Sequence, residues 1–148
     1  MICKRESLGI RGKVEIFRQT NGGWEKAYEK NNLVVNGGLE LIVDHLKDIS
    51  KPVLTHIAVG TGATPVTPSD TILETELLRK PIDDIDTIVN VLTAETLFEN
   101  YEAIGLWKET GMFTQSSGGI MFNRVNIDFN KTTADIVKIK FTVTTSAT

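Results

Sequence analysis

The stretch "HIAVGTGATPVTPSDTILETEL", residues 56–77, is the first place in the chain where residue types and spacing could do chemistry. A glycine-rich turn that ends a strand, here Gly60-Thr61-Gly62, can hold a phosphate with its backbone N–H groups. A P-loop also needs a lysine directly after its last glycine, and the first lysine after Gly62 is Lys80. Pro65 and Pro68 each lack an N–H donor, and Pro65 stands where the dinucleotide pattern G-x-G-x-x-G needs its third glycine. We therefore interpret the stretch as a rigid connection rather than a phosphate site.

The second half of the same stretch has the pattern of a helix start. Thr71 and Glu74 have the spacing of a capping box, in which each side chain bonds a backbone N–H of the other residue. The residues that follow supply an apolar side: Ile72, Leu73, Leu77 and Leu78. These features predict a short helix near residues 72–79.

Other residues capable of catalysis or metal binding are few and scattered. His45 and His56 have no paired spacing, and with one cysteine a zinc site would have to be assembled from distant carboxylates. The three aspartates of residues 83–86 lack the glycine and final glutamate of an EF-hand loop, so a solvated turn is expected there. Cys3 lies close to the N-terminus, and no serine sits in a G-x-S-x-G elbow. We expect neither an enzyme nor a bound metal or cofactor.

Composition limits the partners further. The chain has 148 residues, a net charge of −3, a pI near 5.4 and a hydrophobic share of 41%. No basic face that would neutralise nucleic-acid phosphates is expected, and no apolar stretch reaches the roughly 20 residues needed to span a bilayer. The charged start and the single cysteine favour folding in a reducing cytoplasm. We expect one domain over residues 1–148, in which residues 1–11 form an extended arm.

Alternation with period two predicts a mainly β fold. In residues 136–143, Val137, Ile139, Phe141 and Val143 share one face of a predicted strand, and residues 121–129 follow the same rule. "TNGG" at 20–23 predicts a hairpin turn. The other predicted strands lie at 13–16, 24–35, 53–59, 86–97 and 101–107, followed by a turn-rich block at 109–120.

A helical period interrupts the strands once. Leu39, Ile42, Val43 and Leu46 recur at i, i+3, i+4 and i+7, which predicts an amphipathic helix over about 38–48. About seven strands with one such helix favour an antiparallel β-sandwich over alternating βαβ units.

Some apolar residues are candidates for contacts with other molecules. Met112 and Phe113 fall in a polar segment rich in glycine and serine, so they either contact another subunit or fold back onto their own sheet. Trp107 and Phe113 are the aromatic residues that would carry a contact with a host-surface glycan or receptor. Ile2 and Arg5 lie in the expected N-terminal arm, which would order in an assembly.

The order of motifs resembles that of a group of bacteriophage tail structural proteins. "EKNNLVVNGGLELIVDHL" resembles an element that enters a helix, and "HIAVGTGATPVTPSDTILETEL" resembles a strand followed by a Thr/Pro-rich loop. "AIGLWKETG", "GGIMFNRVNID" and "VKIKFTVT" resemble the later strands, so the likeness covers roughly residues 12–145. The chain departs from the pattern at Ala103, where an acidic residue is usual, and in a longer 109–118 loop.

The resemblance implies a virion protein of the baseplate, the tail-fibre attachment region or the tail tip, with no catalytic residues to carry over. Its partners would be other tail proteins and further copies of itself, and the host cell surface is a third candidate. It would fold in the host cytoplasm before assembly into the virion. Two alternatives stay open: a receptor-binding or glycan-binding module at the tail tip, and a head–tail collar or capsid decoration protein.

Overall fold

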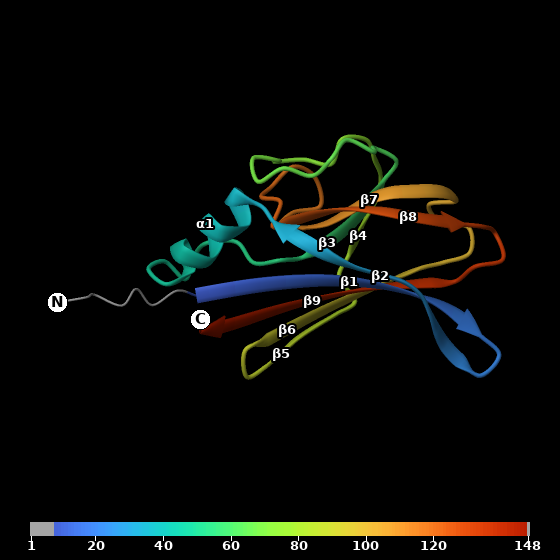
Figure 1. Cartoon of the computed structure of the whole chain (residues 1–148), viewed down its shortest axis with the longest axis horizontal. Helices are drawn as coiled ribbons and strands as arrows, with labels where there is room; N and C mark the ends of the chain where they lie inside the picture. The colour runs from blue at the N-terminus through green and yellow to red at the C-terminus, as the bar shows by residue number, and fades with distance from the viewer. Residues whose placement is uncertain (1–7, 148) are drawn as a thin grey trace.

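The computed structural model describes residues 8–147, and within them nine strands and one helix (Figure 1). In chain order these are β1 (Leu8–Thr20), β2 (Gly23–Val34), α1 (Asn36–His45), β3 (His56–Gly60), β4 (Glu76–Pro81), β5 (Asp84–Ile88), β6 (Val91–Phe98), β7 (Gly105–Phe113), β8 (Asn123–Lys131) and β9 (Val137–Ala147). No helix of the described residues has the length and apolar composition needed to cross a membrane.

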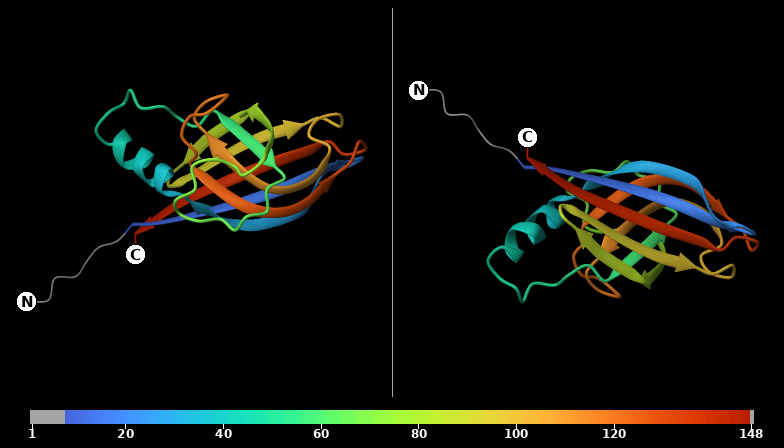
Figure 2. Two further views of the ribbon diagram at one scale, coloured as in Figure 1. Left: turned by 90° about the horizontal axis from the view of Figure 1, so that it is seen from above. Right: turned by 90° about the horizontal axis from the view of Figure 1, so that it is seen from below.

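All nine strands belong to one antiparallel sheet in the order β4-β3-β7-β8-β2-β1-β9-β6-β5. The sheet curls into a half-barrel, which is seen from two further sides in Figure 2. Its two edge strands, β4 and β5, follow one another in the chain and are joined by Ile82 and Asp83 alone. At this corner the Ile82 N–H donates to the Thr55 carbonyl (2.8 Å), and the Asp83 N–H donates to the Glu95 carbonyl (2.9 Å). The corner therefore ties the two edges of the sheet together.

The predicted β class is confirmed, but the predicted seven-stranded sandwich is wrong. Irregular registers at Ile16/Phe17, Val59/Gly60 and Trp107/Glu109 interrupt the ladders, and such bulges bend strands and increase their twist. When a single sheet bends strongly, its inner face encloses the hydrophobic core, and no second sheet is needed. The alternation of apolar residues is the same in a curled sheet and in a sandwich, so periodicity alone did not separate them.

Several local predictions are confirmed. Val137, Ile139, Phe141 and Val143 of β9 are all buried in the core, as their alternation predicted. The β1–β2 turn falls at 21–22, between the paired residues Thr20 and Gly23. The predicted helix exists, although it spans Asn36–His45 rather than 38–48.

Four other predictions of local structure are wrong. The helix near 72–79 is absent, because residues 76–81 pair with β3 as strand β4. The strand predicted at 86–97 is a hairpin, β5–β6, that turns between Ile88 and Val91. Much of the turn-rich block at 109–120 is strand β7, which continues to Phe113. Residues 8–11 of the expected arm pair with β9 as part of β1, and residues 1–7 lie outside the described part of the chain.

Candidate functional site

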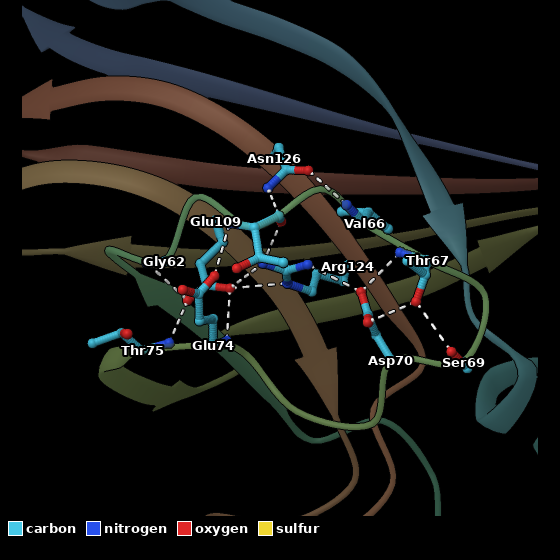
Figure 3. A network of polar contacts seen from close by, with 11 residues as sticks. Gly62, Val66, Thr67, Ser69, Asp70, Glu74, Thr75, Glu109, Arg124 and Asn126 are labelled. Atoms are coloured by element: carbon cyan, nitrogen blue, oxygen red, sulfur yellow. Dashed lines mark hydrogen bonds and ion pairs between the residues drawn. The ribbon is translucent and has the colours of Figure 1, made fainter.

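A buried ion pair on neighbouring strands is the centre of an extended polar network (Figure 3). Glu109 of β7 is fully buried and Arg124 of β8 is 2% exposed. The Arg124 Nε–H donates to Glu109 Oε2 at 2.9 Å, and Nη2 lies 2.8 Å from the same oxygen in an ion pair. Two opposite charges removed from water are tolerated only when their remaining donors and acceptors are also bonded.

Three backbone N–H groups of the 61–75 connection supply those remaining bonds to Glu109. The Gly62 and Thr75 N–H groups donate to Oε1 at 3.1 and 2.8 Å, and the Glu74 N–H donates to Oε2 at 2.9 Å. Both ends of the connection between β3 and β4 are therefore fastened to one carboxylate. The Glu74 side chain accepts from the Thr64 N–H (2.7 Å) and forms no capping box, which removes one reason to expect a helix.

Arg124 and Asn126 fasten the middle of the same connection. Arg124 Nη1 donates to Asp70 Oδ2 and Nη2 donates to the Thr64 carbonyl, both at 3.0 Å. The Asn126 side chain accepts from the Val66 N–H and donates to the Thr64 carbonyl, both at 2.9 Å. All three guanidinium nitrogens of Arg124 are therefore bonded within the chain, and the network holds the connection in place.

The glycines that suggested a phosphate site have a packing role. A Cβ added at Gly60 would lie 2.4 Å from the Thr75 carbonyl oxygen, and one at Gly62 would lie 2.7 Å from Glu109 Oε1. Neither distance is compatible with a real side chain. The connection therefore needs glycine because its backbone lies against the buried carboxylate.

Asp70 has a pKa below that of an ordinary aspartate. Burial, the largest influence, raises the pKa, but hydrogen bonds from Thr67 and Arg124 and the Arg124 charge together lower it by more. The Thr67 N–H and hydroxyl donate to the two Asp70 oxygens at 3.0 and 2.9 Å. This carboxylate is therefore held in its charged form.

The structure places Trp107 inside the half-barrel. Its side chain is fully buried, lies between Phe98 and Phe129 with ring centroids 5.1 and 5.4 Å away, and donates from Nε1 to the Ala103 carbonyl (2.7 Å). A glycan contact would need an exposed Trp107 side chain, and none of this side chain is exposed.

Met112 and Phe113 also face their own sheet. Met112 is fully buried and Phe113 is 1% exposed, with the Arg79 guanidinium 3.7 Å from the centre of the Phe113 ring. Of the two alternatives that the sequence left open, the structure shows the intramolecular one. Ile2 and Arg5 lie outside the described residues.

The two histidines are engaged separately. His45 Nε2 donates to the Pro52 carbonyl (2.7 Å), and His56 Nδ1 bonds the Thr55 hydroxyl (2.7 Å). Burial, and then the Arg79 charge, lower the pKa of His56 below its ordinary value. Over residues 8–147 no group of three His, Cys, Asp or Glu side chains is placed to hold a metal ion.

A feature that the sequence did not reveal is an apolar groove of about 590 Å³ between α1 and the β5–β6 hairpin. Leu41 and Ile42 of α1 form one wall, Ile85 and Leu92 of the hairpin form the other, and Phe122 contributes to the floor. "DIDTIVNVL" alternates like one strand, so its turn was hidden and the groove could not be anticipated.

Comparison of the chain with protein-family models, with curated proteins and with solved structures finds no match in any of the three.

Proposed function

We propose that this protein is a structural component of a bacteriophage tail, or of a phage-derived tail, and acts through contacts with other proteins. The order of motifs over residues 12–145 supports a place in the baseplate, the tail-fibre attachment region or the tail tip. The geometry adds support of a different kind, because it leaves apolar surface uncovered where an assembly would cover it.

The observation that carries the proposal is a set of large apolar side chains exposed at one end of the molecule. Leu46 is 86% exposed, Ile49 is 95% exposed and Val89 is 99% exposed, and Val53 and Ile88 are also exposed. These residues belong to the segment that follows α1 and to the tip of the β5–β6 hairpin, which lie at the same end in Figure 1. Clustered apolar exposure of this kind is typical of a surface that is buried in a complex.

Recognition of a host glycan has less support from the same geometry. The aromatic residues expected to carry that contact, Trp107 and Phe113, are buried. The exposed part of the loop after β7 reads Gln115-Ser116-Ser117-Gly118-Gly119 and contains no aromatic residue on which a sugar ring could stack.

The test uses particles purified from cells that produce the phage or the phage-derived tail. We expect mass spectrometry to find the protein in intact particles at a constant ratio to the main tail proteins. Deletion of its gene should give incomplete tails, and the wild-type gene supplied separately should restore them. Absence of the protein from intact particles, together with normal tails in the deletion strain, would overturn the proposal.

A further inference from the structure

The groove between α1 and the β5–β6 hairpin is open to solvent along an apolar rim. Its inner surface includes Leu41, Leu92, Phe122 and Val143, and Val89 extends the hairpin wall into solvent. The polar groups at its edge are already engaged within the chain. His45 donates to the Pro52 carbonyl, and an Asp86 oxygen accepts the Thr87 N–H at 2.8 Å. The interior of the groove is therefore suited to apolar side chains.

The two segments that carry the walls of this groove have a net negative charge. Segments 36–54 and 82–92 contain two lysines, Lys47 and Lys51, and six acidic residues: Glu40, Asp44, Asp48, Asp83, Asp84 and Asp86. None of these eight side chains forms an ion pair within residues 8–147. The net charge of the two segments, −4, exceeds in magnitude the −3 of the whole chain. Asp86 lines the groove itself, and the other acidic residues belong to the segments that form its walls.

The hairpin tip has a conformation that its residue type disfavours. Val89 has φ +55°, a left-handed backbone that glycine and asparagine adopt readily and a β-branched residue does not. No packing offsets this strain, because the side chain is 99% exposed. A strained residue whose side chain makes no contact within its own chain is typical of a functional position, so Val89 marks the tip as a contact point.

We propose that this groove binds an apolar segment of another virion protein, in which Lys or Arg residues flank the apolar ones. The apolar side chains fill the groove, and the basic side chains meet Asp86 and the other acidic residues of the two segments. A second copy of this chain fits less well, because a two-fold contact through this face would bring the same acidic residues against one another. The inference rests on the proposed assembly function and names the contact and the chemistry of the partner.

The test is photo-crosslinking in cells that assemble the particle. The full chain carries p-benzoylphenylalanine in place of Val89, or, as a matched control, in place of Ile72, which is 68% exposed in the 61–75 connection and does not line the groove. Purified particles are digested, and the crosslinked peptides are sequenced by mass spectrometry. We expect the Val89 site to capture one segment of another virion protein, apolar and flanked by Lys or Arg, in at least tenfold higher yield than the Ile72 site.

Charge reversal then tests the basic character of the partner. Asp84→Lys combined with Asp86→Lys should lower the crosslink yield at position 89 at least about tenfold, because like charges across a contact oppose binding. The matched control is Glu25→Lys combined with Asp128→Lys, which changes the net charge equally on strands away from the groove and should leave the yield unchanged. Thermal unfolding of each purified variant verifies that the fold is kept.

Every other result overturns the inference. Capture of a second copy of this chain, capture of a lipid, capture of an acidic segment, equal yields at the two sites or an unchanged yield after charge reversal would each do so. The abundance of the protein in the same particles is measured separately. A protein that is present in the tail but fails the groove test disproves only the inference, whereas a protein that is absent from the particles disproves the proposed function.

Discussion

Replacing Glu109 by glutamine tests most sharply how the 61–75 connection is held. Glutamine keeps the size of the side chain but replaces one acceptor oxygen by an NH₂ donor. In the wild type the two oxygens accept three backbone N–H groups and the Arg124 Nε–H at 2.8–3.1 Å, and Arg124 Nη2 lies 2.8 Å from Oε2. In Glu109→Gln the new NH₂ group must therefore face N–H groups that have lost their acceptor. Arg124 also loses a fully buried counter-charge.

The expected cost follows from that geometry. Removing one partner of a buried, hydrogen-bonded ion pair destabilises a protein by about 3–5 kcal/mol. Domains of ordinary size have total stabilities of about 5–15 kcal/mol, so the loss is a large part of the whole. We expect the free energy of unfolding of Glu109→Gln to fall by at least about 3 kcal/mol.

Urea unfolding followed by tryptophan fluorescence measures the global effect, since Trp107 is buried next to Phe98 and Phe129. Hydrogen exchange measures the local one, and the amides of Gly62 and Thr75 should lose the most protection. Asp128→Asn is the matched control. It breaks an ion pair between the same two strands, Lys108–Asp128 at 3.0 Å, but Asp128 is 71% exposed, so a change of about 0–1 kcal/mol is expected.

A double variant separates the ion pair from the anchoring of the backbone. If Glu109 served only as the counter-charge of Arg124, then Glu109→Leu combined with Arg124→Leu would recover stability, as apolar replacements of buried pairs often do. We expect no recovery, because three backbone N–H groups would still lack their acceptor. A cost below about 1 kcal/mol for Glu109→Gln, or full recovery in the double variant, would refute this reasoning.

Three further predictions concern two residues of the 61–75 connection and the tip of the β5–β6 hairpin. Gly62→Ala should cost about 1–3 kcal/mol, because its Cβ would lie 2.7 Å from Glu109 Oε1, whereas Gly22→Ala, with nothing within 4 Å, should change the urea midpoint little. Val89→Asn should raise the stability by about 1 kcal/mol through relief of the left-handed strain, and a lower urea midpoint would contradict this. The pKa of Asp70 is lowered on folding, so its charge stabilises the protein above the unfolded pKa of about 3.9 and ceases to do so as pH falls through the lower folded pKa. The cost of Asp70→Asn should therefore be larger at pH 7 than at pH 3, and an equal cost at both would show that the carboxylate charge contributes nothing.

Local patterns predicted the parts of the fold that depend on neighbouring residues. The buried face of β9, the amphipathic helix and the turn after Thr20 each follow from residue types within a few positions of one another. The turn at Val89 was missed because valine and asparagine there lack the Asn-Gly signature of a two-residue hairpin.

The remaining features depend on contacts between residues far apart in the chain. Glu109 lies 47 residues from Gly62 and 35 from Glu74, and no local pattern links a carboxylate to those amides. Pairing of residues 76–81 with β3, which lies about 20 residues earlier in the chain, is the reason that the predicted helix near 72–79 does not form. The hydrogen bonds at residues 82–83, which join the two edges of the sheet, also connect residues far apart in the chain. The groove between α1 and the β5–β6 hairpin is non-local in the same way.

A density map of the assembled tail is the most direct test of the central claim, that this protein works by contacts between tail proteins. We expect density for the half-barrel at the distal end of the tail, with the groove between α1 and the β5–β6 hairpin filled by a segment of a different protein. A complete tail in which no density fits the half-barrel would contradict the proposed function. A fitted half-barrel whose groove faces solvent would contradict the proposed contact.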